Sequence, residues 1–285
     1  MAVIMKPLGL IYAAFIDCIK EHRWEDIEMF LQPQFSKNDK PYDSASFAAE
    51  LQANGDTEIQ LDSVTVDEKG QRIASTILVK WKPSKKLIGI DPPDKQILFM
   101  EQHFNWFVEG KLSRTISMPD HAAVHRQLNH PELPYGPDLV GTDSALAVAS
   151  EPITSGNLAA VYEAYIKCIN DRKMSLQLME FVHAHVIFDG MGLTLEKFRQ
   201  RMESVITAIP DLFAVIHTII TDDQTQRLAA QLESSGTLVK PLAGLEAVGT
   251  QVTFAEHCTY EFRGGKIARI WSLANWGKLG QTKLT

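Results

Sequence analysis

The chain of 285 residues contains an internal repeat, and this repeat limits its possible folds more than any local signal does. Aligned on itself with a shift of 155 residues and no gap, it has fifteen identities over the 59 positions that pair 62–120 with 217–275. An average composition would give roughly three or four. A shift of 150 pairs Tyr12–Glu21 with Tyr162–Asp171, and five of those ten positions are identical. The chain is therefore predicted to be a duplicated domain.

The stretch between the copies, 129–156, has the composition of a linker. It holds four of the thirteen prolines together with three glycines, which favour extended and turning backbone over a packed element. We expect the first copy over 1–128, a linker over 129–154 and the second copy over 155–285.

Each copy begins with helical patterns and continues with strand patterns. Apolar residues at helical spacing open each copy, two shorter helices follow, and the period then changes to the two of strands. In the first copy the strands are expected over Ile59–Asp67, Gln71–Trp81, Ile97–Val108 and Lys111–Met118. This order predicts an α+β domain in which three helices pack on one face of a curved antiparallel sheet.

Composition excludes several classes of function. Thirty-five acidic against 28 basic residues give a net charge of −7, whereas a nucleic-acid-binding face needs concentrated positive charge. No apolar run reaches the roughly 18–20 residues that cross a bilayer, and the first residues lack the pattern of a secretory signal. Three cysteines without metal-type spacing argue against disulfides and zinc. We expect a soluble cytoplasmic protein with no nucleic-acid or membrane partner.

The order of elements and a short motif near the end of each copy carry a family resemblance. The motif is an apolar strand with an inward acid, a Gly-Lys pair, a Trp, and a polar residue four positions later. The second copy has Phe254-Ala255-Glu256-His257, Gly265-Lys266-Ile267, Trp271 and Asn275, and the first has Phe99-Met100-Glu101-Gln102-His103, Gly110-Lys111-Leu112, Ile116 and Asp120. The whole pattern resembles the cone-shaped nuclear transport factor 2-like fold, and within it the SnoaL-like polyketide cyclases.

The resemblance implies two tandem cones, each with a deep apolar pocket for a hydrophobic small molecule, and chemistry without a cofactor or a metal. It also implies that the two sheets pair as an intramolecular pseudo-dimer, so that the protein is a monomer or a homodimer of such a monomer. In the family, the residue four after the Trp is usually an aspartate that acts as general acid/base. This chain divides that pattern between its copies. The first copy has Asp120 but Ile116 in place of the Trp, and the second has Trp271 but Asn275, which cannot transfer a proton.

Strand parity predicts inward carboxylates independently of the family. Alternate residues of a strand share a face, and the largely apolar face of the third strand includes Glu101 in the first copy and Glu256 in the second. A buried carboxylate tends to have a raised pKa, which suits proton transfer near neutral pH. Alternatively, these carboxylates pair with Arg114 and Arg269 on the neighbouring strands and have only a structural role.

The other candidates follow from their positions on these strands. His103 lies two residues after Glu101, and His217 lies on a strand expected to line the second cavity. The catalytic candidates are therefore Glu101, His103 and Asp120 in the first copy, and His217, Glu256 and Asn275 in the second. The substrate-binding candidates are Trp81, Asn105, Tyr260 and Trp271. His183 and His185 share a strand face, but no motif supplies a third ligand, so no metal site is expected.

These features predict a cyclase or isomerase acting on a polyketide or terpenoid intermediate of secondary metabolism. A carboxylate of Glu101, Asp120 or Glu256 would remove a proton next to a carbonyl, while a His or Asn stabilises the enolate. The same pocket could instead carry out a dehydration, and a further alternative is a non-catalytic ligand-binding or scaffold protein. An enzyme should show Glu101 or Glu256 within hydrogen-bond reach of a histidine at an empty apolar cavity. A scaffold should show a cavity filled by aromatic side chains and carboxylates tied to Arg114 or Arg269.

Overall fold

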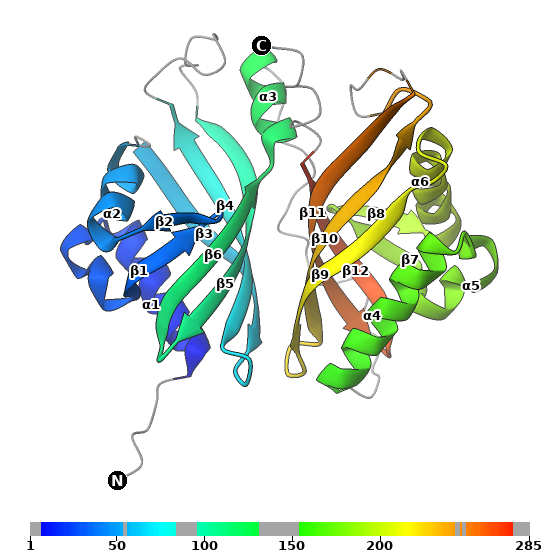
Figure 1. Ribbon diagram of the computed structural model, residues 1–285. Coiled ribbons are helices and arrows are strands. Elements are labelled where there is room, and N and C mark those ends of the chain that lie inside the picture. The colour runs from blue at the N-terminus through cyan, green and yellow to red at the C-terminus, as the bar shows by residue number, and fades with distance from the viewer. Residues whose placement is uncertain are drawn as a thin grey trace. The chain divides into compact units, whose positions relative to one another are not determined.

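The computed structural model describes residues 7–53, 56–83, 96–130, 154–242, 246 and 249–275. The chain divides into two compact units, Met1–Tyr135 and Gly136–Thr285, and each contains one six-stranded sheet with helices (Figure 1). The predicted duplication and the α+β class are thereby confirmed. Most of the expected linker, 129–154, lies outside the described residues, and the pairing of the two copies as a pseudo-dimer stays a prediction.

The first unit contains two helices and a 3-10 turn before the long strands, and one helix after them. Its elements are α1 (Leu8–Lys20), η1 (Trp24–Met29), β1 (Leu31–Lys37), β2 (Lys40–Tyr42), α2 (Ser44–Ala53), β3 (Asp56–Asp67), β4 (Arg72–Lys82), β5 (Ile97–Val108), β6 (Lys111–Pro119) and α3 (His121–Asn129).

The second unit repeats this order up to its last strand. Its elements are α4 (Ser155–Asn170), α5 (Met174–Phe181), β7 (Val182–Phe188), β8 (Met191–Thr194), α6 (Leu195–Ala208), β9 (Phe213–Asp222), β10 (Arg227–Leu238), β11 (Thr250–Arg263) and β12 (Lys266–Ala274).

Each sheet is larger than the sequence patterns predicted. The strand orders are β2-β1-β6-β5-β4-β3 and β8-β7-β12-β11-β10-β9, and the four long strands of each sheet are antiparallel as expected. The added strand β1 pairs in parallel with β6, and β7 pairs in parallel with β12, so the sheets are mixed. The segment of β1, Leu-Gln-Pro-Gln-Phe-Ser-Lys, buries only Leu31 and Phe35, which is too little alternation to identify a strand.

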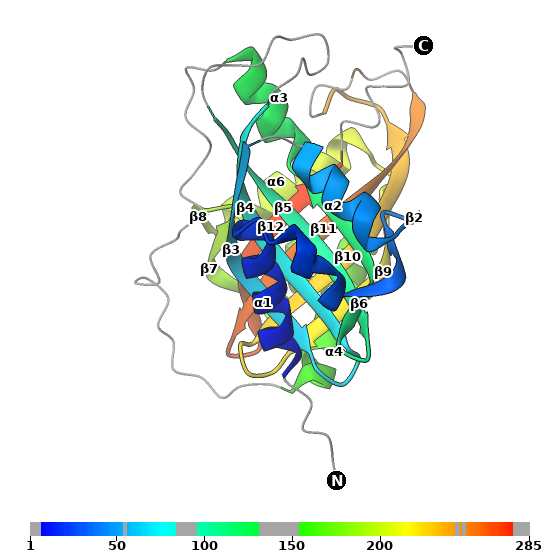
Figure 2. The same cartoon turned by 90° about the vertical axis from the view of Figure 1, so that its left-hand side faces the viewer.

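The helices cover one face of each sheet and form the core with it. Figure 2 shows α1 and α2 lying across the sheet of the first unit. Tyr12 and Phe15 of α1 are buried, and the ring of Tyr12 meets that of Phe107 on β5 edge-on, with centroids 6.3 Å apart. The matching α4 buries Tyr162 and Tyr165 against its own sheet. The apolar stripe that opens each copy is thus the helical side of its core.

A β-bulge occurs at the same place in both copies. In the first sheet the pairing register of β3 with β4 shifts between Leu61 and Ser63. In the second sheet the register of β9 with β10 shifts at the corresponding place, where His217 is the extra residue of β9. Since one extra residue reverses the alternation of the strand, side chains before and after the bulge change faces. The shared bulge is further evidence for duplication.

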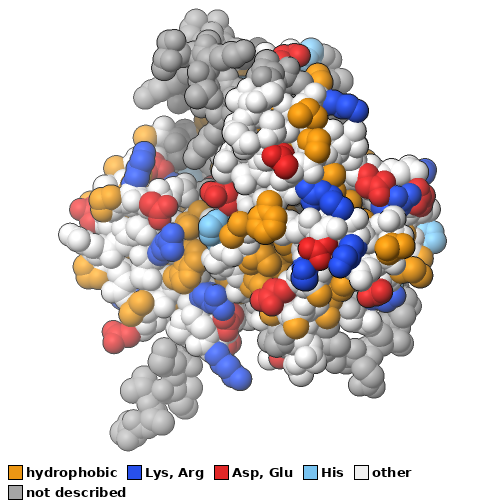
Figure 3. Space-filling model, turned by 45° about the vertical axis from the view of Figure 1, so that its right-hand side comes forward, with side chains coloured by type: hydrophobic (Ala, Val, Ile, Leu, Met, Phe, Trp, Pro, Cys, Tyr) orange, Lys and Arg blue, Asp and Glu red, His pale blue; other side chains and the backbone are white. Residues whose placement is uncertain are grey.

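The described helices and the visible surface agree with the composition. None of these helices combines the length and apolarity that a membrane crossing requires. On the face shown in Figure 3, Lys and Arg side chains are interspersed with Asp and Glu side chains.

Candidate active site in the N-terminal copy

A cavity of about 290 Å³ lies in the first unit, between helices α1 and α2 and the sheet. Its size is near the lower end of small-molecule pockets, roughly 300–1,000 Å³. Most lining side chains are apolar, and they include Phe15, Ile16, Ile19, Phe47, Leu51, Ile59, Ile77, Val79, Trp81, Phe99 and Leu112. The polar lining comes from Tyr12, Lys37, Thr57, Glu101, His103, Asn105 and Thr115. An apolar cavity with a few converging polar groups is the usual form of a ligand site.

Strand β5 supplies the central polar groups of this cavity. Glu101, His103 and Asn105 alternate along one face of β5, as strand parity predicts. The Nε2 atom of His103 lies 3.5 Å from Oε1 of Glu101, an ion-pair distance. Both side chains are about one-fifth exposed, which leaves them accessible from the cavity. The two residues therefore form a histidine–carboxylate pair inside an apolar pocket.

The pKa of Glu101 is lower than expected from its burial alone. Burial would raise it, but the charge and hydrogen bond of His103, a hydrogen bond from Ser117 and the charge of Lys37 together lower it from 4.5 to about 2. The expectation of a raised pKa was wrong for this residue, because three favourable neighbours outweigh desolvation. Glu101 is thus ionised at neutral pH and is a poor proton donor there.

Neither arginine pairs with the carboxylates. Arg114 stands opposite Trp106 in the register of β5 and β6, so it is several residues away from Glu101. Its guanidinium binds Asp39 at 3.0 Å and lies over the Trp106 ring. Arg269 stands opposite Glu261 and lies over the ring of Trp271. Among the described residues, Glu101 and Glu256 therefore do not form the ion pairs with Arg114 and Arg269 that the structural alternative predicted.

Lys37 is a polar cavity residue that the sequence did not identify. Its ammonium group binds Glu50, with Nζ and Oε1 2.5 Å apart, and it lies 5.5 Å from the centre of the Phe47 ring. Tyr42 donates a second hydrogen bond to Glu50. Lys37 ends β1, and because β1 was not predicted as a strand, nothing in the sequence placed this lysine beside β5. Only the parallel pairing of β1 with β6 brings Lys37 to the cavity, and no sequence pattern indicated that pairing.

Trp81 and Asp120 have different placements. Trp81 lines the cavity, with its ring nearly perpendicular to that of Phe99 at 6.4 Å. Asp120 is not among the lining residues, because its carboxylate caps α3 and accepts a hydrogen bond from Ala123 N at 2.8 Å. A carboxylate committed to a helix N-terminus is stabilised there by backbone donors. The family position for a general acid is thus occupied by a capping residue in this copy.

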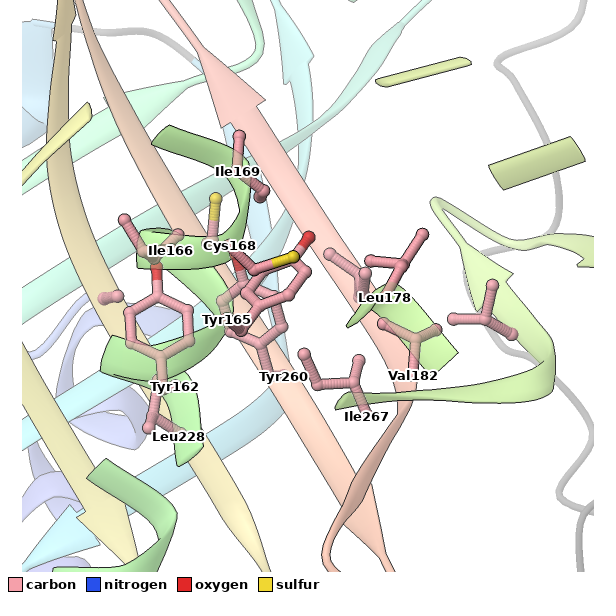
Figure 4. Close-up of a cluster of buried hydrophobic side chains, with 14 of the residues drawn as sticks. Tyr162, Tyr165, Ile166, Cys168, Ile169, Leu178, Val182, Leu228, Tyr260 and Ile267 are labelled. Atoms are coloured by element: carbon pink, nitrogen blue, oxygen red, sulfur yellow. The ribbon is translucent and has the colours of Figure 1, made fainter. Parts of the chain in front are cut away.

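Packed aromatic rings occupy the position in the second copy that corresponds to Asn105 at the cavity wall of the first. At the repeat shift of 155 residues, Ser75, His103, Asn105 and Thr115 correspond to Ala230, Cys258, Tyr260 and Ile270. The ring of Tyr260 packs 4.9 Å from that of Tyr162 and 6.2 Å from that of Tyr165, and Figure 4 shows the three rings together. All three side chains are buried. The predicted substrate-binding residue Tyr260 is therefore a core residue.

Glu256 occupies the inward position predicted for it, but without a histidine. Ser234 Oγ donates a hydrogen bond to its Oε1 at 2.6 Å. Burial raises the pKa of Glu256, and this hydrogen bond only partly offsets the rise. Cys258 follows it on the same face, where the first copy has His103. The two equivalent glutamates are therefore in opposite electrostatic environments.

Three other candidates of the second copy have different placements. The prediction that His217 lines a cavity was wrong, because the bulge in β9 leaves its side chain exposed while Ala214, Ile216 and Ile219 pack against the core. Trp271 lies on the face of β12 opposite to Ile270, which is a core residue. Asn275 pairs its backbone N–H with Ala255, and its side-chain oxygen is buried without a partner among the described residues.

The described residues include no grouping of three His, Cys, Asp or Glu side chains suited to a metal ion. His183 binds the carbonyl oxygen of Arg263 through its ring at 2.6 Å. Asp189, just beyond the end of the same strand, β7, accepts a hydrogen bond from Ser272 N at 2.8 Å. Cys18, Cys168 and Cys258 are buried free thiols.

The two equivalent glutamates are expected to give opposite dependences of stability on pH. Glu101 has a folded-state pKa of about 2, below its ordinary 4.5, so its stabilisation is present above pH 4.5 and is lost as pH falls towards 2. The pKa of Glu256 is raised, so the unfolded chain releases its proton first and stability falls as pH rises above about 4.5.

Urea unfolding between pH 2 and 7 tests this contrast. Glu101→Gln should be less stable than the wild type at pH 7, and the difference should shrink towards pH 2. Glu256→Gln should gain stability relative to the wild type as the pH rises. Glu163→Gln, at an exposed position of α4, is the matched control and should follow the wild type throughout. Differences of the same sign for both glutamates would contradict the assignment.

Comparison with known proteins gives a family match within the second copy. A family model described as SnoaL-like polyketide cyclase matches residues 159–281. A solved SnoaL-like polyketide cyclase from Agrobacterium tumefaciens is 29% identical, with a TM-score of 0.42, and the match covers 44% of this chain and 96% of that one. TsrD from Streptomyces laurentii is 15% identical, with a TM-score of 0.41 and coverages of 45% and 96%. No curated protein matches this chain.

Proposed function

We propose that this chain, in which residues 159–281 are a SnoaL-like domain and the N-terminal half is a second domain of similar fold, is a cofactor-independent cyclase or isomerase whose active site is the N-terminal cavity. The substrate is an apolar carbonyl compound of the polyketide or terpenoid type. The observation that carries the proposal is the pairing of His103 with an ionised Glu101 at the wall of an apolar cavity.

His103 is the general base in this proposal, and Glu101 is its partner. Glu101 faces Nε2, which leaves Nδ1 of the ring to take a proton from a carbon next to the substrate carbonyl. The ionised carboxylate holds the ring and stabilises the imidazolium that results. The enolate carbon then attacks a second carbonyl of the same molecule, and His103 returns the proton to the new alkoxide. This reverses the roles expected from the sequence, in which the carboxylate was the base.

Two alternatives share parts of the same evidence. A dehydratase would use the same base for the first proton and lose hydroxide, as water, from the neighbouring carbon. A scaffold without turnover is favoured by the second copy, where aromatic rings occupy the interior. The first copy fits the enzyme criterion. The second fits the scaffold criterion in its packed aromatic rings but not in its carboxylate, since Glu256 is bound by Ser234 and not by Arg269. We therefore assign catalysis to the first copy and a structural role to the second.

The test is proton exchange in D₂O with 2-tetralone, an apolar ketone with acidic hydrogens next to its carbonyl. Wild-type protein should accelerate incorporation of deuterium, measured by NMR, above the rate in buffer. His217→Gln is the matched control, because this exposed histidine is far along the chain in the other copy, and it should exchange like the wild type. Binding of 2-tetralone without faster exchange would instead support the scaffold alternative.

A further inference from the structure

A buried amide donor without a partner lies at the wall of the same cavity. Asn105 is only 2% exposed, and its Nδ2 makes no hydrogen bond of normal geometry with any described residue, although the amide is near enough to the Tyr12 hydroxyl to affect the pKa of that group. Its other side-chain atom, Oδ1, accepts a hydrogen bond from Thr115 Oγ1 at 2.8 Å. Because Thr115 fixes the oxygen, the NH₂ end of the amide is directed away from it. An unmade hydrogen bond at a buried donor is unfavourable, and its occurrence at a ligand cavity calls for an acceptor.

The neighbours of Asn105 define what that acceptor can be. Tyr12 Oη and Ser75 Oγ are hydrogen-bonded to each other at 2.6 Å. Burial raises the pKa of Tyr12 to about 12, although Ser75 and the nearby amide of Asn105 partly offset the rise. Tyr12 and Ser75 are therefore neutral hydroxyl groups, and the charged Glu101 lies further along the same face of β5. Such surroundings suit a neutral carbonyl oxygen, which becomes negatively charged only during reaction.

The spacing along β5 relates this donor to the proposed base. Residues two apart on a strand are separated by about 6.7 Å on the same face. A ketone that accepts a hydrogen bond from Asn105 therefore presents its neighbouring C–H group towards His103. We infer that the Asn105 amide binds the substrate carbonyl and stabilises the enolate oxygen, and that the substrate class is an apolar ketone or ester inserted with this oxygen at Asn105.

The second copy supplies independent support. Where the first copy has Asn105, Thr115 and Ser75, it has Tyr260, Ile270 and Ala230. The donor and the residue that orients it are thus both absent from the copy in which aromatic rings pack at this position. The inference rests on the proposed function for the location of the site, but it concerns binding of a carbonyl and can be tested without turnover.

The experiment compares 2-tetralone with 2-methylenetetralin, in which a CH₂ group replaces the carbonyl oxygen. The wild type should bind the ketone about five- to tenfold more tightly by calorimetry, as one net hydrogen bond predicts. Carbonyl-¹³C 2-tetralone should also show a lowered C=O stretching frequency in the bound state. Asn105→Leu and Asn105→Asp should each abolish the preference and the shift. Thr115→Val, which frees the amide, should reduce both.

Equal affinities of wild type for the two probes, or an unshifted carbonyl stretch, would overturn the inference, and so would a failure of both probes to bind. A preference that survives in both Asn105 variants, with folding checked by circular dichroism, would do the same. Deuterium exchange separates this result from the proposed function. If the wild type prefers the ketone but does not accelerate exchange, the donor assignment holds and the catalytic proposal fails.

Discussion

Replacing His103 with glutamine is expected to slow exchange of 2-tetralone by about 10²- to 10⁴-fold, the usual contribution of a general base. Glutamine retains polarity and similar size, so the cavity wall is preserved while the proton acceptor is lost. Affinity for the ketone should change much less than the rate. Parallel measurement of exchange by NMR and of binding by calorimetry separates the two effects.

The companion variant Glu101→Gln examines the partner of this base. Loss of the negative charge removes the stabilisation of the imidazolium that forms on proton transfer, so the rate should fall. The exposed His217→Gln again serves as the control. Wild-type exchange in His103→Gln would exclude this histidine as the base, and a wild-type rate in Glu101→Gln would exclude a role for the pair.

Placing the residue of the second copy at the repeat position of Asn105 should close the cavity of the first copy. Asn105→Tyr places the residue of the second copy at the cavity wall of the first, where its ring should occupy the space that the ligand needs. We expect binding of 2-tetralone and its exchange to be lost together, with the far-ultraviolet circular dichroism unchanged. Tight binding by Asn105→Tyr would show that the ligand lies elsewhere.

The reverse substitution, Tyr260→Asn, should mainly reduce stability. It removes a buried ring that packs against Tyr162 and Tyr165, and loss of a large core side chain costs about 3–5 kcal/mol. Denaturant unfolding measures this loss. The matched control is Met179→Ala, which removes an exposed side chain of the same unit and should change the free energy of unfolding little. Tyr12→Phe does not serve as a control because Tyr12 lines the cavity of the first copy.

Strand parity was the part of the sequence that predicted the site best. It placed Glu101, His103 and Asn105 on one inward face, since the alternation of a regular strand is fixed by its geometry. The same reasoning failed for His217, because an extra residue in β9 reverses the alternation and leaves no clear mark in the sequence. Strand parity therefore predicts which face a side chain occupies only up to the next bulge in that strand.

Two other features depended on interactions that a sequence pattern does not contain. Asp120 matches a family position by spacing, yet the helix that follows it recruits its carboxylate as a cap. The cavity itself depends on the volumes of facing side chains, so a pattern that reads as apolar in both copies gives an opening in one and three packed rings in the other. The sheet topology was predicted in its four long strands but not in β1 and β2, which are short and polar.

The contrast between Asn105 and Tyr260 also bears on how such a protein can change over evolutionary time. In an assembly of two identical subunits, every substitution appears twice, so a residue that tightens one interior also closes the other. A tandem chain removes that restriction. One half can accumulate stabilising substitutions that would abolish activity, while the other keeps the looser packing that activity requires. The duplication thus turns a conflict between stability and activity within one sequence into a division between two halves of it.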